Sequence, residues 1–369
     1  MSYEFLESGD EISKFQELIE SYRIDFQNRS KGFELPNINY IGCFQKTVKN
    51  NESLDSKIFV SIPVKNQAQK IISVITTLIE NTNQSFTIGL LFDNCDDESE
   101  RVCKDFFKAN FRNFEKLSQV LFIRSLGDLF EATCENILLL FCSSPYFVSM
   151  QADIYLADKS FFERSLKGFD KVPNLFALSG RAVILLKHKS KFYRTILSLF
   201  VGLCRVIELL RLKKKQKILG PYFRGLKYFG DISDPPKTRM NFNSREFQTI
   251  FLGEAVIRGP IIWRSEIIKQ LSGFNDVAHV LGRDECDMSL RASNSGYVVG
   301  YLPTLSYSYK EMGTSRKKRT VEVQKQLSDR EKIAEQNPSD LSLFWNGHLE
   351  LNKLKNFSKR KIFLNENLI

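Results

Sequence analysis

Residues 118–154, SQVLFIRSLGDLFEATCENILLLFCSSPYFVSMQADI, contain two apolar strands with a helix between them. The first strand is predicted over 118–125. The second is predicted over 146–150, where an apolar run follows Ser144 and Pro145. A strand, a helix and a second strand joined by short connections are typical of a parallel sheet.

The same alternation extends toward the N-terminus. A buried strand is predicted from 57 to Pro63, a helix over 67–82, a second strand over 86–93 and a second helix over 98–111. The sequence therefore predicts an α/β fold with a doubly wound, mostly parallel sheet.

Length and composition exclude several classes of protein. The chain has 369 residues, of which 43% are hydrophobic and 26% charged, so it can bury a sizeable core. Its seven cysteines are odd in number and form no Cys-x-x-Cys pair, and its three histidines are scattered. These facts argue against a disulfide framework, a structural zinc and a zinc hydrolase. The acidic, polar start predicts no signal peptide, and we expect a reducing, cytoplasmic location.

Most of the net charge of +10 lies in one insert, residues 187–217, which holds ten Lys or Arg and one acid. Within it, charges at 194, 205, 208 and 211 interrupt the apolar stretch, so we expect no transmembrane helix. Two alternatives stay open for 192–217: a helix buried under the domain, or an interfacial helix with a polybasic flank on an anionic membrane. We expect no nucleic-acid binding, because interleaved aromatics and a reading element are missing from the pattern.

Carboxylates follow the predicted strands in three places. They are Asp93 with Asp96 and Asp97, then Asp153, then Asp284 with Glu285 and Asp287. Parallel strands end at one edge of a sheet, so these groups can converge and bind a divalent cation or act as a base. The alternatives are structural: Asp153 would cap or turn the chain, and Asp96 and Asp97 would cap a helix.

Six segments, in order, resemble family 2 glycosyltransferases: VSIPVKN, LLFDNCDDES, GDLFEATCENI, FVSMQADI, RGPIIWRSEIIKQLSGFND and RDECDMSLRASNSGYVVGYLP. The resemblance covers residues 57–315 and implies an inverting transferase with the A-type nucleotide-sugar-binding fold. It would make 57–315 the catalytic domain, 1–56 a helical appendage and 316–369 a charged helical extension.

The resemblance also implies a donor site. Pro63 and Asn66 would border the nucleotide, Asp93 would receive the base, usually uracil, and Asn136 matches an Asn of the preceding helix. Gln151 and Asp153 stand where the family has Asp-x-Asp, so Asp153 would hold a divalent cation, Mn²⁺ or Mg²⁺. Gln151 in place of the first Asp removes one charge from that motif.

On the acceptor side, the resemblance makes Glu285 the base, with Asp284 and Asp287 beside it. Lys310 stands where the family often has a metal-binding His, and a protonated lysine would contact the diphosphate directly. Arg181 is a candidate diphosphate contact or a surface residue. Arg258 and Trp263 fall in a segment that lines the acceptor in the family, and Trp263 would stack on a sugar or lie in the core.

The predicted function is the transfer of a sugar, from a nucleotide-sugar donor such as a UDP-sugar, to a glycan or lipid-linked acceptor. The alternative is a degenerate family member that binds glycan without catalysis. A sugar-phosphate nucleotidyltransferase is disfavoured, because no glycine-rich loop follows the first strand.

Overall fold

A computed structural model describes most of the chain. The described residues are 2–6, 9–31, 33–47, 56–182, 228–230, 244–253, 255–257, 259–279, 284–309, 321–336 and 361–364. The insert 187–217, with the two alternatives for 192–217, lies outside them. The predictions for Arg258 and Lys310 lie outside them too.

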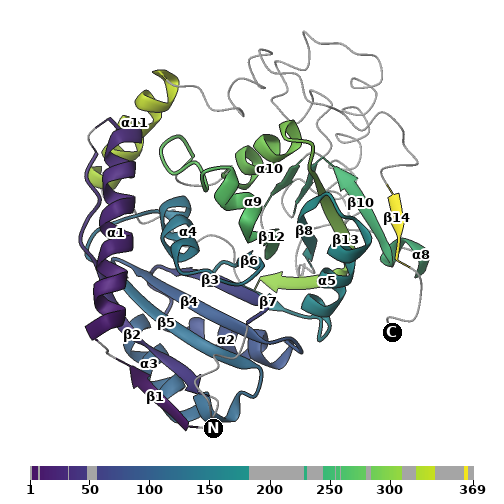
Figure 1. Ribbon diagram of the computed structural model, residues 1–369, viewed down its shortest axis with the longest axis horizontal. Helices are drawn as coiled ribbons and strands as arrows, with labels where there is room; N and C mark the ends of the chain where they lie inside the picture. The colour runs from purple at the N-terminus through teal and green to yellow at the C-terminus, as the bar shows by residue number, and fades with distance from the viewer. Residues whose placement is uncertain are drawn as a thin grey trace, which may run out of the picture.

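Strands and helices alternate along the chain (Figure 1). The strands are β1 (Ser2–Leu6), β2 (Ile38–Thr47), β3 (Ile58–Val64), β4 (Phe86–Asp93), β5 (Leu117–Ser125), β6 (Tyr146–Ser149), β7 (Ile154–Leu156), β8 (Leu175–Ala182), β9 (Tyr228–Gly230), β10 (Thr249–Gly253), β11 (Ala255–Ile257), β12 (Ile261–Arg264), β13 (Val298–Tyr309) and β14 (Lys361–Phe363). The α-helices are α1 (Gly9–Arg29), α2 (Ile71–Glu80), α3 (Ser99–Asn110), α4 (Glu131–Leu140), α5 (Phe161–Lys171), α8 (Ser244–Phe247), α9 (Ser265–Gln270), α10 (Asp284–Asn294) and α11 (Val321–Gln336).

A 12-stranded sheet runs through the centre in the order β1-β2-β5-β4-β3-β6-β12-β8-β13-β10-β14, with β7 paired to β13. Strand β3 pairs in parallel with β4 and β6, β4 with β5, and β8 with β13. Strand β12 runs antiparallel between β6 and β8. Six central strands therefore share one direction, and the predicted α/β class with a mostly parallel sheet is confirmed.

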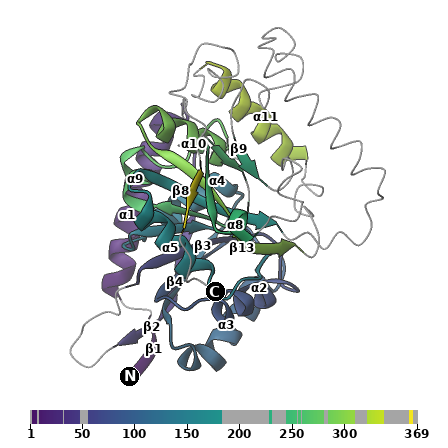
Figure 2. The same cartoon turned by 90° about the vertical axis from the view of Figure 1, so that its right-hand side faces the viewer.

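Helices cover both faces of this sheet (Figure 2). Alternate residues of a strand point to opposite faces. Val60 and Ile62 of β3 accordingly pack in the apolar cluster that includes α2 and α3, whereas Phe59 packs with α1, α4 and α9. The sheet is doubly wound, as predicted, and the second face carries the residues discussed below.

The N-terminal segment is more than a helical appendage. Strand β2 adds to the sheet by antiparallel pairing with β5, and β1 pairs with β2. Helix α1 packs against α4 and β2 through Phe15, Ile19 and Phe26, which are buried. The purely helical description of 1–56 is therefore wrong, because its apolar stripe and a strand both close on the central core.

The C-terminal segment also returns to the domain. Helix α11 lies beside one end of α1, and β14 pairs antiparallel with β10 at the far edge of the sheet (Figure 1). None of the helices in the described ranges combines the length and the apolar character needed to cross a membrane.

Candidate active site

The carboxyl ends of β3 and β6 mark the point where the strand order reverses. From β3 the chain continues to β4 on one side, while β6 lies on the other. In open α/β sheets, ligands bind in the crevice at such a point. Pro63 and Asn66 lie at the end of β3, Asp93 ends β4, and Gln151 and Asp153 follow β6. The structure thus brings these five predicted residues to one edge of the sheet.

Asn66 ties together the two loops that follow β3 and β4. It has a left-handed φ of 52°, and its Oδ1 accepts a hydrogen bond from the Asp96 N–H at 3.0 Å. Asp97 accepts from the N–H of Ser99 at 2.9 Å, and from that of Ala68 at 3.0 Å. Asp97 therefore accepts from the first amide of α3, although the N-cap residue of that helix is Glu98, which makes no side-chain cap hydrogen bond.

Asp93 holds the loop between β5 and α4. It is 8% exposed, and its two carboxylate oxygens accept the N–H groups of Leu129, at 2.7 Å, and Phe130, at 3.3 Å. Burial raises the pKa of Asp93 from 3.8 to about 6, although these two backbone hydrogen bonds and the Lys65 charge oppose the change. Asp93 therefore exchanges a proton near physiological pH.

This pKa predicts how stability depends on pH. In the folded protein Asp93 loses its proton at about pH 6, whereas in the unfolded chain it does so near 3.8. As pH rises between these values, the unfolded state is favoured by deprotonation, so the free energy of unfolding falls. In Asp93→Asn this fall should be smaller by about 2 kcal/mol between pH 4 and pH 7. Urea unfolding at both pH values measures it. Asp96→Asn, an exposed neighbour, should follow the wild type, and an Asp93→Asn curve parallel to wild type would contradict the assignment.

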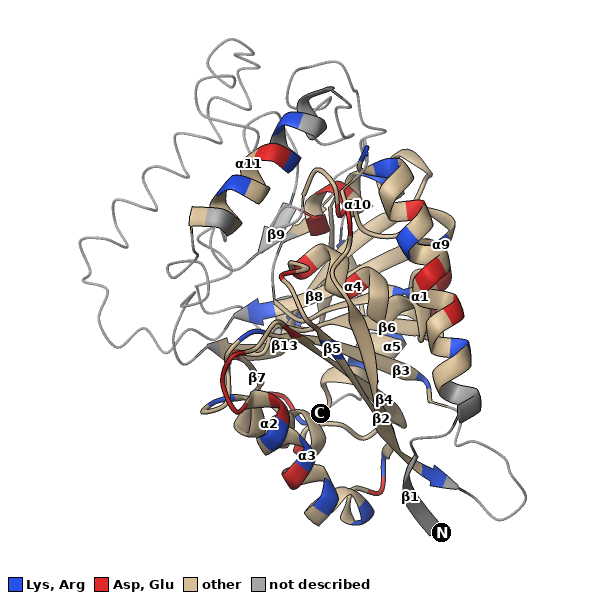
Figure 3. Cartoon of the chain, turned by 90° about the vertical axis from the view of Figure 1, so that its left-hand side faces the viewer, with Lys and Arg blue, Asp and Glu red and all other residues tan. Residues whose placement is uncertain are grey.

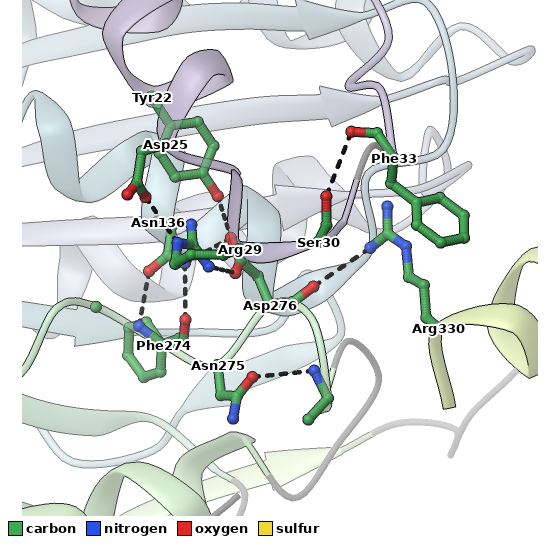
Figure 4. A network of polar contacts seen from close by, with 12 residues as sticks. Tyr22, Asp25, Arg29, Ser30, Phe33, Asn136, Phe274, Asn275, Asp276 and Arg330 are labelled. Atoms are coloured by element: carbon green, nitrogen blue, oxygen red, sulfur yellow. Dashed lines mark hydrogen bonds and ion pairs between the residues drawn. The ribbon is translucent and has the colours of Figure 1, made fainter. Parts of the chain in front are cut away.

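Asn136 lies in the interior and not at the sheet edge. Its Nδ2 donates to the Phe274 carbonyl at 2.9 Å and to Asp276 Oδ2 at 3.0 Å, and its Oδ1 accepts from the Phe274 N–H at 2.7 Å. The structure gives Asn136 a role in joining α4 to residues 274–276 (Figure 4). Asn136, the position that matches the family motif, thus makes hydrogen bonds between distant parts of the chain.

The turn after β6 connects the predicted metal motif to α4. Gln151 donates from Nε2 to Glu131 Oε1 at 2.7 Å, and its carbonyl accepts the Ile154 N–H at 3.1 Å. Asp153 lies inside this turn and is half-buried. Gln151 stands where the resembling family has an acid, and its side chain donates a hydrogen bond to Glu131, in the first turn of α4.

Four carboxylates gather between the starts of α4 and α10, which carry the acidic segments in Figure 3. Asp284, Glu285 and Glu135 are 2%, 6% and 3% exposed, and Glu131 is half-buried. Burial raises the pKa of Asp284 well above its ordinary value, and the charges of Glu285, Glu131 and Glu135 raise it further. Burial also raises the pKa of Glu135, with added repulsion from Glu131 and Glu285. The pKa values of Asp284 and Glu135 are therefore raised by the charges of their neighbours as well as by burial.

This grouping has a chemical consequence. Neighbouring carboxylates cannot all ionise at low cost, and burial raises the pKa of both Asp284 and Glu135, which favours their protonated forms. Within the described part of the chain, Asp284 Oδ1 and Glu135 Oε2 are buried without a hydrogen-bond partner. These two oxygen atoms therefore keep unused hydrogen-bonding capacity inside the carboxylate group.

The described residues do not fit a metal site by themselves. Among them, no group of three His, Cys, Asp or Glu side chains could hold a metal ion. We accordingly derive no chemical step through a cation.

Two predicted site residues belong to the interior. Asp287 is fully buried, and its Oδ2 pairs with Arg291 Nε at 3.0 Å, so its carboxylate already has a cationic partner inside the domain. Trp263 is 0% exposed, lies edge-on to Phe274, and donates from Nε1 to Ser149 Oγ at 3.0 Å. Of the two alternatives for Trp263, the structure shows the core position, because its ring is fully buried behind the sheet edge.

Arg181 stays at the edge as a half-buried residue near the end of β8. Its guanidinium lies over the ring of Phe247 at 5.1 Å. Its Nε is buried and has no hydrogen-bond partner among the described residues. Arg181 is therefore more enclosed than a simple surface arginine.

Sequence analysis missed Glu131 and Glu135. They lie four residues apart on α4, so they point to one face of the helix. The sequence signal was a pair of acids in EATCENILLL, a segment rich in apolar residues. The structure buries this segment from Ala132 to Leu139. Buried acids of this kind need a specific reason.

Comparisons with known proteins give structural neighbours alone. No family model matches the sequence, and no curated protein matches it. TarS 1–349 from S. aureus, also solved in complex with UDP-GlcNAc, is 11% identical with a TM-score of 0.42; the match covers 69% of this chain and 60% of TarS 1–349. This chain thus spans less than two thirds of that protein's length.

Two further structural neighbours were solved with a nucleotide or nucleotide sugar and with Mn²⁺. The mannosyltransferase PcManGT from Pyrobaculum calidifontis, in complex with GDP-Man and Mn²⁺, is 10% identical over 91% of this chain and 83% of its own, with a TM-score of 0.46. GalNAc-T7 with UDP, GalNAc and Mn²⁺ is 10% identical over 87% of this chain and 56% of its own, with a TM-score of 0.49.

Proposed function

We propose that the chain is an inverting glycosyltransferase with the A-type nucleotide-sugar-binding fold. It would move a hexose from a nucleotide-sugar donor, a UDP-sugar in the first instance, to a hydroxyl of a glycan or lipid-linked acceptor. The observation that carries this proposal is a set of carboxylates, the buried Asp284 and Glu285 with the half-buried Glu131, beside the switch point of the sheet. The ordered resemblance of six segments to family 2 glycosyltransferases supports the same function.

The proposed chemistry uses Glu285 as the base. Burial and the neighbouring acids raise the pKa of Asp284, which favours its protonated form, and we assign the role of base to Glu285. As the acceptor oxygen bonds to the anomeric carbon, the bond from that carbon to the diphosphate breaks, and the hydroxyl proton passes to Glu285. The nucleoside diphosphate leaves with the bonding electrons.

The donor would lie along the ends of β3, β4 and β6. Pro63 and Asn66 would border the nucleotide, and Asp93 would receive the base through a carboxylate that already fixes the neighbouring loop. Asp153 is the carboxylate we assign to a divalent cation that accompanies the diphosphate. Arg181, Arg258 and Lys310 are the basic side chains we assign to diphosphate or acceptor.

A thermal-shift panel tests the donor site. UDP, GDP, TDP and CMP would each be added with and without Mn²⁺ to wild type and Asp153→Asn. We expect UDP to raise the melting temperature, with a manganese-dependent part that disappears in Asp153→Asn. A UDP shift that is indifferent to manganese would remove Asp153 from the metal assignment. No shift with any nucleotide would contradict the proposed donor, and would favour a glycan-binding protein without transferase activity.

The sequence also supports a peripheral membrane contact through 192–217 on the cytoplasmic side. Deleting that segment should reduce co-sedimentation with anionic vesicles and leave binding to neutral ones unchanged. Unchanged binding to anionic vesicles would remove this part of the proposal.

A further inference from the structure

Helix α11 brings one buried cation from the C-terminal segment into the domain. Arg330 is 4% exposed, whereas Lys325 and Lys332 of the same helix are exposed. It lies beside α1 and residues 274–276 (Figure 4). A charged side chain buried this far from solvent needs a specific environment.

That environment consists mainly of aromatic rings. The Arg330 guanidinium lies 5.2 Å from the ring centre of Phe130, 5.3 Å from Phe26 and 5.7 Å from Phe33. Its Nη1 donates to the main-chain carbonyl of Asp276 at 3.4 Å. Within the described residues, no carboxylate pairs with it directly, and its Nε has no hydrogen-bond partner. Cation–ring contacts therefore dominate how Arg330 is held.

Phe130 links this cation to the sheet edge. It precedes the first residue of α4 with a left-handed φ of 68°, which a bulky residue adopts only when its surroundings hold it there. Its N–H donates to Asp93, and the next residue, Glu131, accepts the hydrogen bond from Gln151. Arg330 thus contacts the ring of Phe130, whose N–H bonds to Asp93 and whose next neighbour in the chain, Glu131, bonds to Gln151.

We propose that Arg330 is a positioning residue for the donor site: by stacking on Phe130 it fixes the loop between β5 and α4. The loop in turn holds Asp93 and the Glu131–Gln151 pair at the sheet edge. This inference rests on the proposed function, in that the site being positioned is the nucleotide site. It gives α11 a role in the site although the helix itself lies outside the sheet.

Arg330→Met tests the inference, with Arg330→Lys as a milder change and Lys332→Met as the matched control on the exposed side of α11. Two quantities are measured: amide hydrogen exchange of Leu129 and Phe130, and the dissociation constant for UDP. In Arg330→Met we expect both amides to exchange roughly tenfold faster, and UDP to bind roughly tenfold more weakly, because the buried cation loses its contact with the Phe130 ring. Strand β3 should keep wild-type protection.

The other variants make the outcome decisive. Arg330→Lys keeps the charge but lacks the planar group, so it should fall between Arg330→Met and wild type, and it replaces Arg330→Met if that variant does not fold. Lys332→Met should match wild type in both measurements. Unchanged exchange at Leu129 and Phe130, or equally faster exchange in β3, would overturn the inference. If wild-type protein binds no UDP, the proposed function fails, and the exchange rates alone decide the role of Arg330.

Discussion

Glu285→Gln should lower the rate of sugar transfer by about 10²- to 10⁴-fold while nucleotide affinity stays close to wild type. The amide has the size of the carboxylate but cannot accept the acceptor's proton. Because Glu285 lies at the start of α10 and not at the ends of β3 and β4, the donor contacts should persist. Transfer is measured with saturating donor, and affinity by titration with UDP.

Asp284→Asn is the matched variant for Glu285→Gln. Burial and three neighbouring acids raise the pKa of Asp284, which favours the uncharged side chain, and an amide resembles that form. The loss of activity should therefore be much smaller than for Glu285→Gln. The reverse order of the two losses would move the base to Asp284, and full turnover by Glu285→Gln would contradict the assignment.

The central strands were predictable from sequence because their signal is local. Residues 58–64 and 86–93 are continuous apolar runs, and a strand buried on both faces requires such a run. The edge strand β2 was not predictable in the same way. Its sequence, INYIGCFQKT, mixes polar and apolar residues, and its partner β5 comes about 80 residues later. Only the tertiary pairing makes that segment a strand.

In the candidate site, too, some features could be predicted from the sequence and others depend on tertiary contacts. Positions at strand ends, such as Asp93 and Gln151, follow from the topology once the strands are known. Their partners do not, because Asp93 bonds to amides 36 and 37 residues away, and Asn136 to groups 138 and 140 residues away. The burial of Trp263 was open from sequence for a related reason: an apolar run does not reveal which side chains lie behind the edge.

Asp276 is the second position where a single change should have a large effect, here on stability. Its carboxylate is 0% exposed; it accepts hydrogen bonds from the Tyr22 hydroxyl and from Asn136, and it pairs with Arg29 Nη1 at 2.5 Å. Asp276→Asn leaves that cation without its buried charged partner, and the new amide NH2 must face a donor, either Arg29 or the Tyr22 and Asn136 pair. We expect the free energy of unfolding to fall by about 2 to 4 kcal/mol, since removing one member of a buried pair is strongly destabilising.

Asp25→Asn provides the control, because Asp25 pairs with the same Arg29 at 2.7 Å but is 62% exposed at its side chain. An exposed pair four residues apart on a helix contributes about 0.3 to 0.5 kcal/mol, so this variant should unfold almost like wild type in urea. Equal losses for the two variants would mean that the buried partner has no special importance. A loss confined to Asp276→Asn would mean that α1 is held on the domain through this carboxylate, and that the N-terminal segment is an integral part of the fold.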